Sequence, residues 1–173
     1  MNQKTKLTMG ALALIGGAGG GLNLYHRIVD RLVRENFTQL SAGNYEHILP
    51  QMARRFEHFF SGTHPLGGRR HTLDSMRRWF ERLYRLNQQL RFEILGVAVS
   101  GTPLNTLVVV EWIDRATLAN GEDYLNQGVH FVRMSWGKVT SLHAYLDTQE
   151  FAAGCERMAA QGIEEAAAAP IVD

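Results

Sequence analysis

The sequence predicts an α+β fold with helices on one side of a curved antiparallel sheet that can wrap a pocket. Three extended runs follow one another at residues 106–115, 124–135 and 138–146. Residues 120–121 (Asn-Gly) and 136–137 (Trp-Gly) separate them, and Asn-Gly favours a tight hairpin because both residues tolerate a positive φ. Helical periodicity precedes the strands, which indicates that helices cover one side of the sheet.

Before the sheet, the chain carries an amphipathic helix and a short strand. Apolar residues recur at helical spacing from Leu24 to Leu40 with charged residues between them, which predicts one buried stripe. Gly43 ends this helix, and residues 55–60 favour a strand. The loop at residues 61–68 is too rich in glycine and proline for regular structure.

A further helix, a strand and the last helix complete the order of elements. The helix starts near Thr72, and a strand at residues 90–99 follows it. Asp147 opens a capping-box sequence, Asp-Thr-Gln-Glu. We therefore interpret its carboxylate as a helix cap in preference to a catalytic acid. The last helix runs to about Gly162.

Composition sets the class of protein. A length of 173 residues suits one domain, and 45% hydrophobic with 20% charged residues predicts a globular core. A net charge of +1 argues against a nucleic-acid partner. The single Cys155 excludes an internal disulfide and a multi-cysteine zinc site, and we expect it to be a buried, inert thiol.

The two ends differ from the rest of the chain. Residues 1–22 are expected to be a flexible, Gly-rich tail, residues 23–163 a single domain, and residues 164–173 a C-terminal tail. The apolar run at residues 9–15 is shorter than the roughly 20 residues that cross a bilayer. We therefore expect no membrane partner and a cytoplasmic location.

Arginines are concentrated around the helix that follows Thr72. Arginines spaced along a helix form a solvated face more often than a phosphate site, and we interpret them so. The residues are Arg69, Arg70, Arg77, Arg78, Arg82 and Arg85.

Strand alternation identifies Asp114 as a candidate catalytic residue. It shares one face of its strand with Val108, Val110 and Trp112, and this apolar face is expected to point inward. A carboxylate that ends an apolar row is costly unless it is paired, hydrogen-bonded or neutral. The alternative is a strand-end aspartate that caps the following turn.

His130 is the second candidate catalytic residue. It shares a face with Val132 and Met134 on the next strand, and the hairpin can bring it near Asp114 or Trp112. A carboxylate beside an imidazole gives a general acid or base near neutral pH. A structural histidine remains the alternative.

Four further side chains are candidates for the wall of a ligand pocket. Trp79 and Tyr84 are core aromatics in the alternative interpretation. No histidine pair has the spacing of a metal site, so we expect no metal. The candidate ligand-binding residues are His58, Trp79, Trp112 and Tyr84.

Several segments resemble the SnoaL-like and ketosteroid-isomerase-like branch of the nuclear-transport-factor-2-like superfamily. They are residues 40–45 (LSAGNY), 76–80 (MRRWF), 109–112 (VVEW) and 137–147 (GKVTSLHAYLD). The resemblance covers about residues 24–158. It implies a cone-shaped α+β barrel around a hydrophobic pocket, a homodimer formed through the sheet, and no metal or organic cofactor. Its enzymes, which include isomerases, polyketide cyclases and epoxide hydrolases, use a buried Asp or His, whereas other members only bind ligands.

The resemblance transfers to individual residues unevenly. Asp114 falls at the carboxylate of the epoxide-hydrolase-like members, but Trp112 stands where they carry an arginine. Ala144 stands where many cyclase-like members carry an acidic residue. The base of the isomerases would fall near Glu57 or His58, and their oxyanion-side acid near Val129 or His130.

Three functions remain open. The first is a pocket protein for a small hydrophobic molecule that performs acid–base chemistry as an isomerase, cyclase or hydrolase, with Asp114 and His130 as the proton-transfer groups. The second is a non-catalytic ligand-binding or dimerisation module. The third is a partner-binding domain that uses His143 and Tyr145 on the outer sheet face. Contact between Asp114 and His130 at an open cavity would favour the first, and their separation or a filled interior would favour binding.

Overall fold

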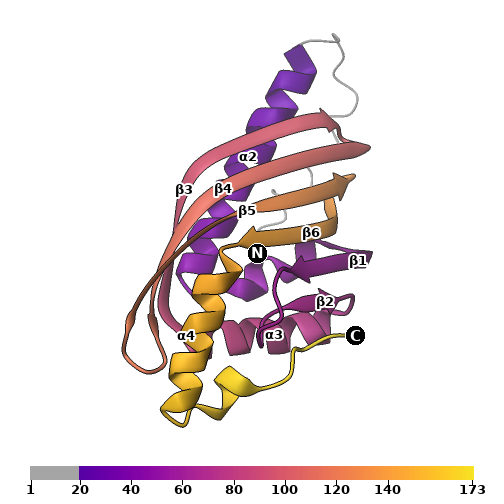
Figure 1. Cartoon of the computed structure of the whole chain (residues 1–173). Coiled ribbons are helices and arrows are strands. Elements are labelled where there is room, and N and C mark those ends of the chain that lie inside the picture. The colour runs from indigo at the N-terminus through magenta and orange to yellow at the C-terminus, as the bar shows by residue number, and fades with distance from the viewer. Residues whose placement is uncertain (1–19) are drawn as a thin grey trace.

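The computed structural model describes residues 20–173, and the expected tail at residues 1–22 lies almost entirely outside them. Within these residues, a curved sheet of six strands, in the order β2-β1-β6-β5-β4-β3, carries three α-helices and three short 3-10 helices (Figure 1). The strands are β1 Met52–Phe60, β2 Gly68–Arg70, β3 Asn87–Thr102, β4 Asn105–Leu118, β5 Asp123–Ser135 and β6 Lys138–Leu146. The helices are α2 Gly20–Ser41, η2 Tyr45–His47, η3 Leu49–Gln51, α3 Leu73–Leu86, α4 Thr148–Ala160 and η4 Glu164–Ala167.

The sheet is curved and unclosed, which confirms the predicted α+β class, but it is not wholly antiparallel. Strands β3 to β6 form successive antiparallel hairpins, whereas β1 runs parallel to β6. The register of β3 against β4 shifts at two places, and such bulges bend a strand and increase its twist. The curvature gives the sheet an inner face that the helices can fill.

The tight hairpin turn is at Trp136-Gly137 and not, as predicted, at Asn120-Gly121. Trp136 and Gly137 have φ values of 50° and 73°, so this pair forms the turn with two positive φ angles. In the Asn120-Gly121 turn only Gly121 has a positive φ, of 89°. The side-chain oxygen of Asn120 instead accepts from the backbone amide of Glu122, so a four-residue connection links the strands. An Asx-type contact has replaced the expected left-handed asparagine.

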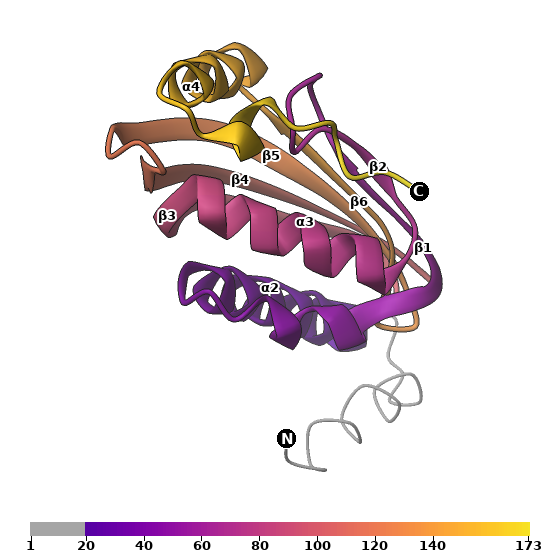
Figure 2. The same cartoon turned by 90° about the horizontal axis from the view of Figure 1, so that it is seen from below.

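Helices α2 and α3 lie on the concave side of the sheet (Figure 2). The buried residues of α2 are Tyr25, Val29, Val33 and Phe37, at every fourth position. The last three belong to the predicted stripe, but Leu24 at its start is 51% exposed and Tyr25 is buried instead. The side chain of Thr72 accepts from the amide of Ser75 and caps α3. Both helices therefore face the sheet with their apolar stripes.

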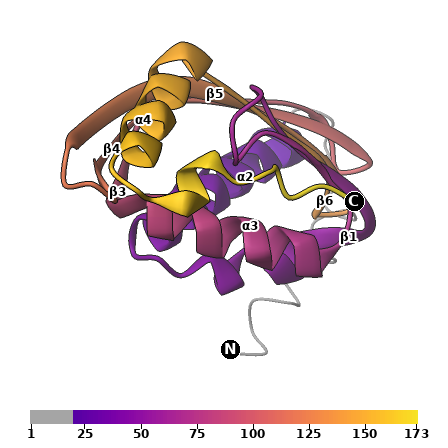
Figure 3. The same cartoon turned by 60° about the horizontal axis from the view of Figure 1, so that its bottom comes forward.

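Helix α4 lies beside the hairpin between β4 and β5 (Figures 1 and 3). Arg157 of α4 pairs with Glu122 of the hairpin at 2.7 Å. The carboxylate of Asp147 accepts from the amides of Gln149 and Glu150, which confirms that it caps this helix. Cys155 is buried and free, as predicted.

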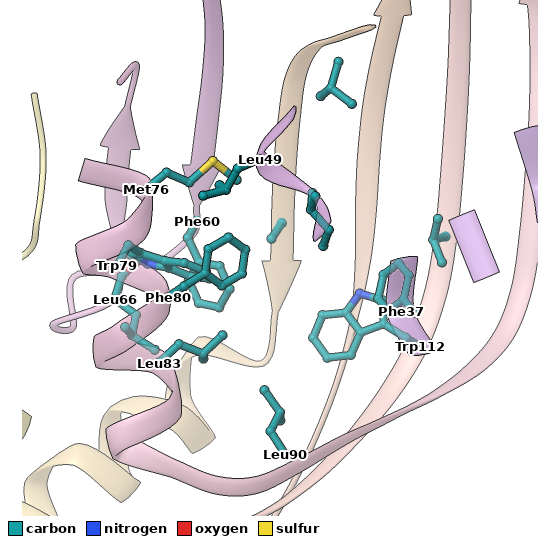
Figure 4. Packing of buried hydrophobic residues seen from close by; sticks show 14 of the residues in the cluster. Phe37, Leu49, Phe60, Leu66, Met76, Trp79, Phe80, Leu83, Leu90 and Trp112 are labelled. Atoms are coloured by element: carbon teal, nitrogen blue, oxygen red, sulfur yellow. The ribbon is translucent and has the colours of Figure 1, made fainter. Parts of the chain in front are cut away.

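The core joins α3 to β1 through large side chains (Figure 4). Most arginines of α3 lie exposed on its outer face, as predicted. They also form ion pairs, for example Arg77 with Glu46 and Arg85 with Glu165. Arg70 is an exception, because it lies on the unpredicted strand β2 and is fully buried. The sequence interpretation of Arg70 as a surface residue was wrong.

The segment 164–173, which the sequence analysis set apart as a tail, runs along α3 and β2. Its Glu165 pairs with Arg85 at 2.7 Å, and a carboxylate oxygen of Asp173 accepts from the His71 amide at 2.6 Å. No helix within the described part of the chain is long and apolar enough to cross a membrane.

Candidate functional site

The inner face of β4 carries Val110, Trp112 and Asp114, as strand alternation predicted. Each of them faces a residue of β5 in the antiparallel register. The pairs are Val110 with His130, Trp112 with Gly128, and Asp114 with Asn126.

Buried Trp112 and partly buried His130 form a polar pair. The indole Nε1 of Trp112 donates to Nδ1 of His130 at 2.6 Å. Phe37 of α2 packs edge-on against the imidazole, with ring centroids 5.5 Å apart, and Phe92 of β3 packs edge-on against the indole. Burial lowers the pKa of His130 to about 4, so the ring is neutral at pH 7.

Asp114 is a buried carboxyl with an unpaired oxygen. Its Oδ1 has no hydrogen-bond partner among the described residues, and the side chain is buried. Burial raises the pKa of Asp114 to about 7, although backbone hydrogen bonding at Asn126 and at Asp114 itself opposes the shift. A buried carboxyl whose pKa lies near 7 is the type of group that functional sites use for proton transfer.

The structure does not bring Asp114 and His130 together. Asp114 faces Asn126, whereas His130 faces Val110, four positions away along β4. At the rise of a strand these positions are about 13 Å apart. Trp112 lies between them on the same face, and its indole, in place of the Asp114 carboxylate, is hydrogen-bonded to His130. The two residues therefore belong to different environments.

Asn126 is a polar residue of this face that the sequence analysis missed. Its amide donates to the Tyr124 hydroxyl and to the Asp147 carbonyl, and its oxygen accepts from the Asp147 amide at 3.1 Å. Burial, with the nearby Asp114 charge, raises the pKa of Tyr124. Asn126 has the same strand parity as His130, which is the signal that could have identified it.

An apolar cavity of about 70 Å³ lies between α2 and the sheet. His130 is the one titratable side chain among residues 20–173 that lines it, and the polar amides of Asn36 and Gln51 bond to each other at 2.9 and 2.8 Å. An apolar cavity of about 150 Å³ holds benzene in another protein, so a molecule of that size enters this one only if α2 moves away from the sheet. The lining residues are Leu32, Val33, Asn36, Phe37, Leu40, Ile48, Gln51, Met52, Val110, His130, Val132, Met134, Val139 and Leu142.

His58 and Trp79 lie outside this cavity, in the core between β1 and α3. Nδ1 of His58 accepts from Arg70 at 3.0 Å, and Trp79 packs edge-on against its imidazole. The indole of Trp79 donates to the carbonyl of Leu66 at 2.7 Å. Both side chains are buried with partners of their own, as core residues are.

Tyr84 also lies outside the cavity lining. Its hydroxyl donates to the carbonyl of Leu40 at 2.6 Å, and its ring stacks on Tyr45. The contact joins α3 to the end of α2. No group of three or more His, Cys, Asp or Glu side chains in residues 20–173 is arranged to hold a metal ion.

The convex face of the sheet carries two open grooves of about 640 and 470 Å³. Tyr145 lines both of them, and it is 43% exposed beside Phe131, which is 40% exposed. His143 also lines the smaller groove, and its Nε2 lies 2.7 Å from Glu57. Burial acts to raise the pKa of Glu57, but hydrogen bonds from His143 and Arg69 hold it below its usual range.

The curved sheet, the concave helices and the small interior cavity define a cone-shaped α+β fold of the nuclear-transport-factor-2-like type. The sequence matches the SnoaL-like domain over residues 33–142, so the chain belongs to the SnoaL-like family. This match lies within the region on which the sequence resemblance rested. Comparison with curated proteins gives no match.

Solved structures of similar fold come from bacteria and a fungus. An NTF2-like protein of unknown function from Burkholderia pseudomallei is 21% identical with a TM-score of 0.63, covering 69% of this chain and 91% of that one. PrhC from Penicillium brasilianum is 14% identical with a TM-score of 0.69, covering 82% and 94%. A putative polyketide cyclase from Xanthomonas campestris is 18% identical with a TM-score of 0.59, covering 73% and 95%. At these identities the likeness establishes the fold and leaves the activity open.

Proposed function

We propose that this chain is a pocket protein that binds a small hydrophobic molecule between α2 and the concave face of the sheet. The observation that carries the proposal is the apolar cavity, whose wall includes the titratable side chain of His130. Small-molecule sites combine such apolar linings with a few polar groups. Because Asp114 and His130 lie apart, the proposal does not use them as a catalytic pair.

Benzene and xenon test this proposal, because both enter dry apolar cavities. We expect benzene to raise the melting temperature of the wild type. Val132→Phe, which fills the cavity from β5, should abolish this rise. Val129→Phe is the matched control, because Val129 lies on the convex face of the same strand. Absence of binding to the wild type, or equal binding to both variants, would contradict the proposal.

Acid–base catalysis by Asp114 alone is a second candidate function. Its unpaired, buried Oδ1 and its pKa near 7 favour it. An ionised Asp114 would remove a proton beside the carbonyl of a cyclic substrate and return it as the acid, without a metal or organic cofactor.

Hydrogen–deuterium exchange of small cyclic ketones in D₂O, followed by proton NMR, tests this second function without knowledge of the natural substrate. We expect the wild type to accelerate exchange beside the carbonyl and Asp114→Asn to lose the acceleration. Asp123→Asn is the control, because Asp123 is an exposed carboxylate on β5. Equal rates for wild type and Asp114→Asn would exclude a catalytic role for Asp114.

We also propose a homodimer in which the convex faces of two copies pack together. The exposed aromatic pair Phe131 and Tyr145 supports it, since it forms an apolar patch beside two open grooves. Glu111 and Arg133 lie exposed on this same face and carry opposite charges, so a two-fold arrangement can pair them across the interface.

Sedimentation velocity tests the dimer. Phe131→Asp should shift a dimeric wild type to monomer, whereas Trp136→Ser should not, because Trp136 lies in the β5–β6 turn and lines neither groove. A monomeric wild type at micromolar concentration would contradict this proposal and leave the pocket proposal standing.

A further inference from the structure

The Trp112–His130 hydrogen bond determines which imidazole nitrogen carries the proton. The indole Nε1–H is a donor with no acceptor capacity. Because it donates to Nδ1 of His130 at 2.6 Å, Nδ1 has to be the unprotonated nitrogen. A neutral imidazole carries one N–H, so the proton of His130 lies on Nε2.

His130 then has one free donor beside the cavity. Its side chain lines the cavity and keeps some accessible surface, although Phe37 and Trp112 pack against the ring. No hydrogen bond from Nε2 to another described residue is present, and the two strand neighbours of His130 are Val110 and Ala144. Neither neighbour offers an acceptor side chain, so Nε2–H is available to a ligand.

We propose that Trp112 is a positioning residue that fixes His130 as an Nε2–H donor, and that the cavity therefore selects uncharged ligands with an acceptor oxygen. Ketones, aldehydes, esters and ethers belong to this class. The inference rests on the proposed pocket and adds the chemistry of its occupant. A ligand that only donates would leave two donors facing each other in an apolar space, which is costly.

The preference for ligands with an acceptor oxygen can be measured with three five-membered rings of similar size. Cyclopentanone offers an acceptor, pyrrole offers a donor, and cyclopentane offers neither. Relative to cyclopentane, we expect Trp112→Phe to lower the affinity for cyclopentanone by about twofold, because a mixture of tautomers leaves only about half of the rings as Nε2–H donors. Trp79→Phe is the matched control, because that indole donates to the Leu66 carbonyl and does not touch His130.

Nitrogen-15 NMR of the full chain reads the tautomer directly. We expect the wild type and Trp79→Phe to show Nε2–H with an unprotonated Nδ1, and Trp112→Phe to show a mixture of tautomers. An Nδ1–H ring in the wild type overturns the inference, and this measurement needs no variant.

The ligand series separates the inference from the proposed function. Binding of cyclopentane without preference for cyclopentanone over pyrrole overturns the inference and leaves the pocket standing. Failure of all three rings to bind overturns the pocket and the ligand class with it. A cyclopentanone preference that Trp112→Phe weakens and Trp79→Phe keeps supports the inference.

Discussion

The guanidinium Nε of Arg70 donates to Nδ1 of His58 at 3.0 Å, and both side chains are buried. His58 therefore acts as an acceptor, and burial with the Arg70 charge lowers its pKa well below the usual range. Burial lowers the pKa of Arg70 to about 10, against the opposing charge of Asp173. The remaining donors of Arg70 go to the carbonyls of Leu66, Gly67, Gly68 and Ile171.

Removal of Arg70 should destabilise the fold strongly. Arg70→Ala leaves His58 and several buried carbonyls without a donor, and we expect a loss of about 3–5 kcal/mol in the free energy of unfolding. Arg69→Ala is the control, because Arg69 is half-exposed and its ion pair with Glu57 contributes about 1 kcal/mol or less. Urea denaturation measures both. Similar losses for the two variants would contradict the structural role of Arg70.

The stability of the protein should depend on pH through Asp114. Its pKa is about 7 in the folded chain and 3.8 in the reference state, so between these values the folded chain binds more protons than the unfolded chain. Stability therefore falls as pH rises, and the full cost of the buried charge is present above pH 7. Asp114→Asn lacks this cost.

Urea denaturation at pH 5 and pH 8 checks this dependence. The stability of Asp114→Asn relative to wild type should increase by roughly 2.5 kcal/mol between the two pH values. Asp123→Asn should show no such change. A constant difference between Asp114→Asn and wild type would mean that Asp114 titrates normally.

Gly128 should be essential for the position of Trp112. A Cβ at this position would meet the carbonyl of Tyr145 and would lie 2.7 Å from Cζ2 of the Trp112 indole. We expect Gly128→Ala to cost about 1–3 kcal/mol and to disturb the Trp112–His130 bond. Gly96→Ala on β3 is the control, because its Cβ would meet nothing closer than a Glu111 oxygen at 3.8 Å. Denaturation with Trp fluorescence measures both effects, and equal behaviour of the two variants would refute this.

The β5–β6 turn should tolerate, and benefit from, replacement of Trp136. A tryptophan with a φ of 50° carries a steric cost that asparagine largely avoids. We expect Trp136→Asn to raise the melting temperature, with a gain of about 1 kcal/mol. Trp136→Ala keeps the cost and should gain less, so a larger gain from alanine would point to the exposed indole and not to the backbone.

Much of the fold follows from local patterns. Apolar spacing predicts α2 and the inner face of β4, and the capping-box sequence predicts the cap at Asp147. Strand β2 could not be predicted in this way, because three residues in a glycine-rich loop carry no periodic signal. Its burial of Arg70 depends on partners from β1 and from the segment near Ile171, far away in the sequence.

The candidate site was predicted less completely than the fold. Parity assigns Asp114 and His130 to the inner face, but it does not fix which positions face each other. That register depends on the length of the β4–β5 connection, and the four-residue turn places His130 opposite Val110. The size of the cavity depends on how α2 packs on the sheet, which no local pattern contains.

The parallel pairing of β1 with β6 has a kinetic consequence. Glu57 and His143 are in contact although they are 86 residues apart, whereas β3 to β6 are linked by hairpins. Closing so long a loop loses chain entropy before any contact offsets it, so we expect β1 to dock after the hairpin strands have formed. In stopped-flow experiments Phe56→Ala should then mainly accelerate unfolding, and Val110→Ala should slow refolding; the opposite pattern would contradict this order. The edge that holds His58 and Arg70 would be the last part of the sheet to assemble.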